Sequence, residues 1–221
     1  MKYFLRDLHQ DMVEAWDRFF SQEPDVEVSS GEILKGPRAD AIVGPANSFG
    51  FMDSGIDVTY SEYFGRALGE NLRAVLKNQY DGELPVGQAV TISTWTKDYP
   101  YLISAPTMRV PMVVAGTVNA YLAFRAVIRE VARFNKEQAD RGLANRINSV
   151  LCPGLGTAAG KMGPDVCARQ MYFAYRVCEK KDPAYIPAPY TAYGMHERLA
   201  MGLDPVPQPM STAGCSRRRK R

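Results

Sequence analysis

The chain has 221 residues and a mass of 24.6 kDa, a length that predicts one domain with additional segments rather than two full domains. Hydrophobic residues make up 46% and charged residues 23%, which is typical of a globular protein and excludes wholesale disorder. The formal net charge is +3 and five positive charges lie in residues 217–221, so the remaining chain carries −2 and does not predict a basic nucleic-acid-binding face.

Apolar runs alternate with segments of helical periodicity along most of the chain. The predicted strands cover residues 3–5, 26–29, 41–44, 89–94, 101–105 and 147–151, and the predicted helices cover residues 11–20, 61–77, 117–138 and 164–178. Strands that alternate with helices are typical of an α/β domain, and the low charge of residues 41–43 and 149–151 suits buried central strands. We therefore predict a three-layer α/β/α sandwich.

The composition changes after Lys181, where prolines recur without a clear period. We interpret this stretch as an extended tail that wraps the domain. Its end, residues 217–221, is a block of Arg and Lys of the kind that is usually solvated. The predicted organisation is an α/β domain over residues 1–180 and a Pro-rich extension with a basic tail over residues 181–221.

The loop at residues 45–57 follows the predicted strand 41–44 and leads into a helix. Loops at the carboxyl ends of strands are where α/β proteins bind ligands. Gly50 and Gly55 allow close approach of a ligand, while Asn47 offers an amide and Asp57 a carboxylate. The same Asn and Asp would equally suit capping of a helix and its turns, and the residues alone leave both interpretations open.

A second loop, residues 152–161, follows the predicted strand 147–151 and contains three glycines. Successive backbone N–H groups in such a loop can cradle a phosphate or diphosphate, although a purely structural turn would have the same composition. The loop is not a Walker A motif, because Met162 follows Gly160 and Lys161 where that motif needs Ser or Thr.

In this order, and with the segment 30–34 before them, the two loops resemble the macrodomain family over residues 26–178. The resemblance implies a mixed sheet between helices and the binding of ADP-ribose. It places the adenine at residues 32–33, the distal ribose at residues 45–47 and 55–57, and the diphosphate at residues 154–160. The ligand-binding residues that it implies are Glu32, Ile33, Ala46, Asn47, Gly55, Ile56, Asp57, Gly154, Leu155, Gly156, Thr157, Ala158, Ala159 and Gly160.

Several positions depart from the family pattern. Glu32 stands where the family usually has Asp, and residues 51–55 keep one glycine where many hydrolytic members have several. Ser61 stands where such members often have His, and Ala159 or Met162 where they have an aromatic residue. Binding is therefore better supported than any particular reaction.

The predicted function is binding of ADP-ribose or a derivative, with hydrolysis at the distal ribose left open. The candidate substrates are ADP-ribose 1″-phosphate, O-acetyl-ADP-ribose and ADP-ribosylated molecules. In such a reaction Asn47 would orient the ribose or a water, and Asp57 would act as the base or as a carboxylate that orients the water. The alternatives are a non-catalytic reader of ADP-ribose and a protein that associates with nucleic acid through residues 217–221.

Other features weigh against further chemistry. The four cysteines form no C-x-x-C pair and the two histidines, His9 and His196, are far apart, so we expect no metal and no cofactor. Cys152 we interpret as a small buried residue, and Arg109 either reaches an anionic ligand or is an exposed loop residue. The N-terminal apolar stretch is too short for a signal peptide and no run approaches the length of a membrane span, so we expect a cytoplasmic protein.

Overall fold

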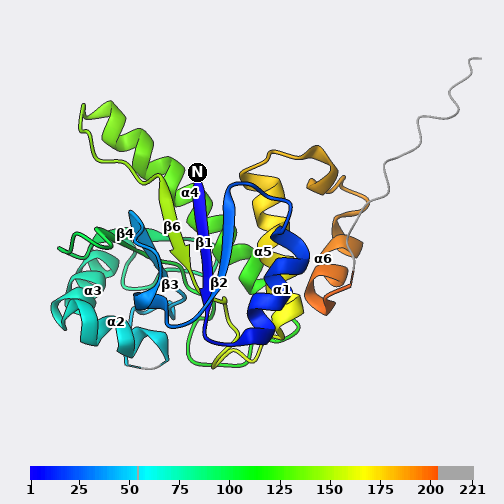
Figure 1. The fold of residues 1–221 in the computed structure, drawn as a ribbon, viewed down its shortest axis with the longest axis horizontal. Coiled ribbons are helices and arrows are strands. Elements are labelled where there is room, and N and C mark those ends of the chain that lie inside the picture. Colours follow the sequence, from blue (N-terminus) through cyan, green and yellow to red (C-terminus); the bar gives the residue numbers. More distant parts are fainter. Residues whose placement is uncertain (54, 204–221) are drawn as a thin grey trace, which may run out of the picture.

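The computed structural model describes residues 1–53 and 55–203. Its centre is a six-stranded sheet in the order β2-β1-β6-β3-β5-β4. The N-terminal strand β1 lies between β2 and β6 (Figure 1). The strands are β1 (Lys2–Asp7), β2 (Val26–Ser30), β3 (Ala41–Gly44), β4 (Val90–Ser93), β5 (Tyr101–Ser104) and β6 (Ser149–Cys152). All neighbouring pairs are parallel except β4 and β5, so the sheet is mixed, as predicted.

Helices cover both faces of the sheet, which confirms the three-layer architecture. The helices are α1 (Gln10–Phe20), α2 (Ile56–Phe64), α3 (Ala67–Gln79), α4 (Asn119–Asp140), α5 (Pro164–Cys178) and α6 (Ala192–Met201), with 3₁₀ turns η1 (Ile33–Lys35) and η2 (Pro183–Tyr185). Side chains of α1, α4 and α5 form one hydrophobic core with one face of the sheet, and those of α2 and α3 form a second core with the other face. In β1, Tyr3 and Leu5 belong to the first core while Phe4 packs against the second, as the alternation of side chains along a strand requires.

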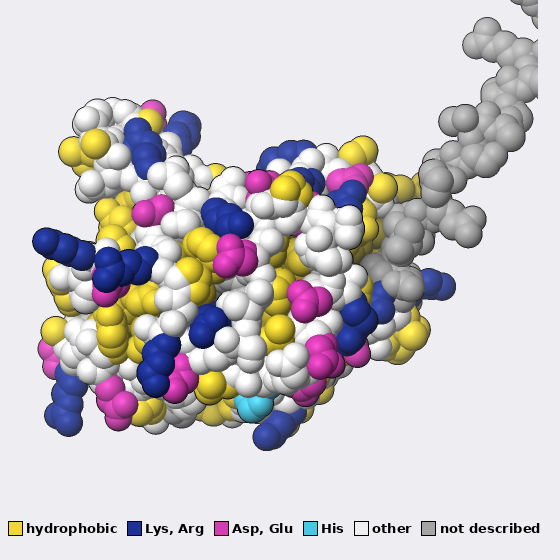
Figure 2. All heavy atoms as spheres, in the orientation of Figure 1, with side chains coloured by type: hydrophobic (Ala, Val, Ile, Leu, Met, Phe, Trp, Pro, Cys, Tyr) yellow, Lys and Arg dark blue, Asp and Glu magenta, His cyan; other side chains and the backbone are white. Residues whose placement is uncertain are grey.

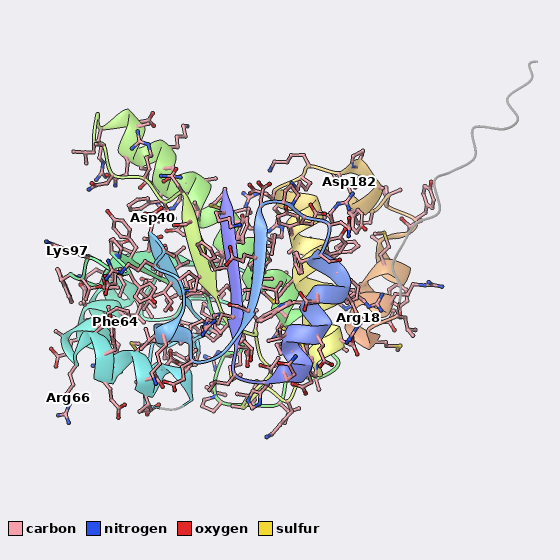
Figure 3. The ribbon with its side chains drawn as sticks, viewed as in Figure 1. Arg18, Asp40, Phe64, Arg66, Lys97 and Asp182 are labelled. Carbon is pink, nitrogen blue, oxygen red and sulfur yellow. The ribbon has the colours of Figure 1, made fainter. Side chains whose placement is uncertain are left out.

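Asp40 fixes the pairing of β3 with β6 at the amino-terminal edge of the sheet. Its Oδ2 atom accepts hydrogen bonds from the backbone N–H groups of Asn148 and Ser149 at 2.8 and 3.0 Å. Figure 3 labels Asp40 at this edge. Because β1, β3, β5 and β6 are parallel, their carboxyl ends all lie at the opposite edge. The loops that follow these strands therefore converge there.

The helix predicted over residues 61–77 is instead two helices, α2 and α3. Gly65 separates them with a φ of +87°, a backbone conformation that residues with a Cβ rarely adopt. Phe64 and Arg66 flank this break, and the Arg66 side chain extends away from the molecule (Figure 3). The first of the two helices begins at Ile56, which places Asp57 in its first turn.

The interpretation of the C-terminal stretch as an extended tail is wrong for residues 192–201, which form α6. Leu199 of α6 is buried, and its carbonyl oxygen accepts a hydrogen bond from Gln170 Nε2 of α5 at 3.2 Å. A short helix with little periodicity is difficult to predict from the sequence, because it is stabilised by packing on a neighbouring element rather than by its own residues. The basic block at residues 217–221 lies outside the described residues, and the domain division at residue 180 stays a prediction.

Candidate functional site

A cavity of about 800 Å³ opens at the edge where the carboxyl ends of the parallel strands meet. It is bordered by the segments that follow β1, β2, β3, β5 and β6. All of the residues predicted to bind a ligand line it except Leu155. Leu155 belongs to the second loop but is fully buried, and its backbone N–H donates to Cys167 Sγ at 3.3 Å.

The side chain of Asn47 holds the first loop in shape. Its Oδ1 atom accepts hydrogen bonds from the backbone N–H groups of Phe49 and Phe51 at 3.0 and 3.3 Å, and its Nδ2 atom donates to the Phe51 carbonyl oxygen at 2.9 Å. These bonds use both acceptor positions of the amide oxygen and one of the two N–H groups. Asn47 is therefore a turn-forming residue that can still offer one N–H group to a molecule in the cavity.

Asp57 is a buried carboxyl group in the lining of the cavity. Its side chain is buried beside Gly44 at the end of β3, and no described residue forms a hydrogen bond with its carboxylate. Burial, and to a smaller extent the negative charge of Asp53, raise its pKa to about 7. The N-cap of α2 is Gly55 and no side chain caps it, so the capping interpretation of Asp57 is wrong. A carboxyl group with a pKa near neutrality, facing a cavity, is suited to general acid–base chemistry.

Two glycines shape the second loop. Gly156 has a φ of +73°, and a Cβ on Gly160 would lie only 2.4 Å from the Gly156 carbonyl oxygen. The backbone N–H groups of residues 156–160 donate no hydrogen bond to any described residue. A row of unpaired backbone donors bordering a cavity is the arrangement that binds phosphate groups in other proteins.

The end of β1 contributes cavity residues that the sequence did not indicate. Arg6 donates from Nε to the Glu32 carbonyl oxygen at 3.0 Å, and the carboxylate of Asp7 accepts a hydrogen bond from the backbone N–H of Gly154 at 3.0 Å. The carboxylate of Glu32 itself forms an ion pair with Lys35 at 2.8 Å. Only the parallel pairing of β1 with β2 and β6 brings this strand to the site, and no local signal in residues 2–9 reveals that pairing.

A segment between β5 and α4, residues 105–114, joins the two loops; the sequence indicated only Arg109 of this segment as a candidate for the site. The backbone N–H of Thr107 donates to the Ala46 carbonyl oxygen at 3.0 Å, and that of Val114 donates to the Gly160 carbonyl oxygen at 2.7 Å. Arg109 of the same segment is not among the cavity-lining residues. It forms an ion pair with Glu83 at 2.7 Å, so the interpretation of Arg109 as an anion-binding residue is wrong.

Cys152 is fully buried, and burial raises the pKa of its thiol, so it is not a nucleophile at neutral pH. Within residues 1–53 and 55–203 no group of three His, Cys, Asp or Glu side chains is placed to hold a metal ion. No helix in that part of the chain combines the length and hydropathy needed to cross a membrane.

Comparison with known proteins gives a family and a fold. A family model described as "Macro-like domain" matches residues 9–186. An uncharacterized protein of Aeropyrum pernix is 31% identical over 159 residues, which cover 72% of this chain and 75% of the relative. A second, from Aquifex aeolicus, is 32% identical over 157 residues, 71% of this chain and 84% of the relative.

Solved structures of macrodomains have the same fold. The macrodomain of Mycobacterium tuberculosis DarG superposes with a TM-score of 0.54 at 20% identity, over 67% of this chain and 88% of that one. The Oceanobacillus iheyensis macrodomain with ADP also gives 0.54, at 17% identity, over 69% of this chain and 75% of that one. At these identities the likeness is one of fold alone.

Proposed function

The chain belongs to the macro-like domain family, and from that premise we propose that it binds ADP-ribose or an ADP-ribose derivative in the cavity at the carboxyl edge of the sheet. The observation that carries the proposal is the row of unpaired backbone N–H groups at residues 156–160, because a diphosphate needs several donors close together. The presence of ADP in the Oceanobacillus macrodomain structure supports a nucleotide as the ligand.

The proposed ligand lies across the cavity, with the adenine at Glu32 and Ile33 and the diphosphate on the second loop. The distal ribose is then next to Asn47, Gly55 and Asp57. A side chain at Gly55 would meet no atom within 4 Å, so there is open space for a ribose at that point.

We further propose hydrolysis of the bond between the distal ribose and its substituent. Asp57 in its ionised form takes a proton from a water molecule, and the water oxygen bonds to the substrate atom that loses the leaving group. The bond between that atom and the leaving group breaks, and solvent protonates the leaving group. The pKa of about 7 supports this role, since a general base works best when its pKa is close to the working pH. The free N–H of Asn47 would position the ribose or the water.

Two measurements test the proposal. Calorimetric titration should give saturable binding of ADP-ribose and weaker binding of ADP and AMP, which lack the distal ribose. Absence of heat and of any thermal shift up to millimolar ADP-ribose would refute the binding proposal. Incubation with ADP-ribose 1″-phosphate, O-acetyl-ADP-ribose and ADP-ribosylated protein, with product analysis, then identifies the reaction.

A reader of ADP-ribose without catalysis is the second candidate, favoured by Ser61. Ser61 lies one helical turn after Asp57, and its hydroxyl donates to the Met52 carbonyl oxygen at 3.1 Å, so this side chain is used within the protein. Clear binding of ADP-ribose by the wild-type protein, with no turnover of any of the three substrates, would establish the reader.

Association with nucleic acid through residues 217–221 is less well supported. Figure 2 shows basic and acidic side chains interspersed over the visible face rather than gathered in a basic patch. A salt series on nucleic-acid binding, with and without residues 216–221, tests this idea because phosphate contacts give a steep salt dependence.

A further inference from the structure

Thr107 carries a buried hydroxyl group without a hydrogen-bond partner. The residue is 0% exposed, and its Oγ1 atom has no partner among the described residues. Thr107 also lines the cavity, although it belongs to neither glycine loop. A buried hydroxyl that forms no hydrogen bond destabilises the folded chain, so it calls for an explanation at this position.

The backbone holds Thr107 firmly in place. Its N–H donates to the Ala46 carbonyl oxygen at 3.0 Å, and its own carbonyl oxygen accepts a hydrogen bond from Asn119 Nδ2 at 2.8 Å. Both backbone groups of Thr107 thus form hydrogen bonds. The hydroxyl is the remaining hydrogen-bonding group of the residue, and it has no partner among the described residues.

Thr107 stands where the two glycine loops meet. The next residue, Met108, pairs with Asn47 in a parallel β-bridge, which places Thr107 beside the first loop. A Cβ on Gly156 would lie 3.9 Å from the Cβ of Thr107, which places it beside the second loop as well. In the proposed function this is the junction of the diphosphate and the distal ribose.

We propose that Thr107 is a binding determinant outside both glycine loops, whose hydroxyl donates a hydrogen bond to the ligand beyond its AMP portion. This inference rests on the proposed binding of ADP-ribose. The partner atom is an oxygen of the distal phosphate or of the distal ribose, since these groups lie between the two loops. Binding then provides the hydrogen bond that the folded chain alone lacks.

The test is Thr107→Val, which removes the hydroxyl and keeps the shape of the side chain. It should weaken ADP-ribose binding about tenfold, the effect expected for one hydrogen bond to a charged oxygen, and leave AMP binding within twofold. Thr107→Ser keeps the hydroxyl and should bind ADP-ribose within about threefold of the wild type.

Thr91 on β4 provides a matched control, because its Oγ1 atom is also buried and unpartnered among the described residues, but it does not line the cavity. Thr91→Val should leave ADP-ribose affinity unchanged, and both valine variants should melt at or above the wild-type temperature.

Unchanged ADP-ribose affinity in Thr107→Val would overturn the inference, as would an equal loss in Thr107→Ser or an equal loss for AMP. These results would leave the proposed function intact. Failure of the wild-type protein to bind ADP-ribose would overturn both.

Discussion

Replacing Asp57 by Asn should stabilise the protein, and the structure sets the size of the effect. The carboxylate is buried, forms no hydrogen bond with a described residue, and has a pKa of about 7 where an unperturbed Asp has 3.8. Ionising it therefore costs about 4 kcal/mol more in the folded chain than in the unfolded chain. Asn has nearly the size of the protonated acid and carries no charge. The difference in stability between variant and wild type therefore measures the cost of the buried negative charge.

The stabilisation should depend on pH in a definite direction. Because the pKa of Asp57 is higher in the folded chain than in the unfolded chain, the folded chain binds the proton more tightly. Protonation of Asp57 at low pH therefore favours the folded state. The resulting stability falls as pH rises from about 4 through about 7, where Asp57 ionises in the folded state. The difference between Asp57→Asn and the wild type should be below about 1 kcal/mol at pH 4 and about 4 kcal/mol at pH 8.

Thermal unfolding of both proteins between pH 4 and pH 8 measures this difference. For a chain of this length, about 4 kcal/mol corresponds to a rise in melting temperature of about 10 °C at pH 8. Asp17→Asn, on the exposed surface of α1, is the control and should show no such rise. A melting temperature of Asp57→Asn at pH 8 equal to or below that of the wild type would refute the reasoning. If the protein is a hydrolase, the same variant should lose turnover by about 10²-fold or more while keeping ADP-ribose affinity within a few-fold.

Three further substitutions test how the cavity is built. Gly156→Glu should abolish ADP-ribose binding in calorimetry, because it forces a side chain into a φ of +73° and adds negative charge at the diphosphate; full affinity in the folded variant would remove the second loop from the site. Val114→Ala should lower the free energy of unfolding, measured in urea, by about 2 kcal/mol and should weaken ADP-ribose binding several-fold, because Val114 Cγ2 packs against Gly160. Lower stability with unchanged affinity would show that the second loop keeps its shape without this contact. Asn47→Ala should lower both melting temperature and affinity through the loss of its bonds to Phe49 and Phe51, and an unchanged melting temperature would contradict the structural role.

The parts of the fold and site that the sequence predicted are those with a local signal. The six strands appear as short apolar runs, and the two loops combine glycines with polar residues directly after buried strands. What escaped prediction depends on contacts between distant segments. Arg6 and Asp7 reach the cavity only because β1 pairs between β2 and β6, and α6 is held by packing on α5. The presence of Gly65 could have predicted the break between α2 and α3, but a single glycine inside a helical pattern is often tolerated.

The hydrogen bonds of the site divide its polar groups into two sets. Asn47 and Asp7 are bonded to the backbone of the first and second loops respectively, and the segment 105–114 joins both loops, so the cavity has its shape before any ligand arrives. The groups without described partners include the N–H groups of residues 156–160, the Asp57 carboxylate and the Thr107 hydroxyl, and these residues border the cavity. A folded chain tolerates unpaired buried polar groups at a cost in stability. Their presence around one cavity is what a binding site requires, because a ligand can then gain these bonds without having to order the loops.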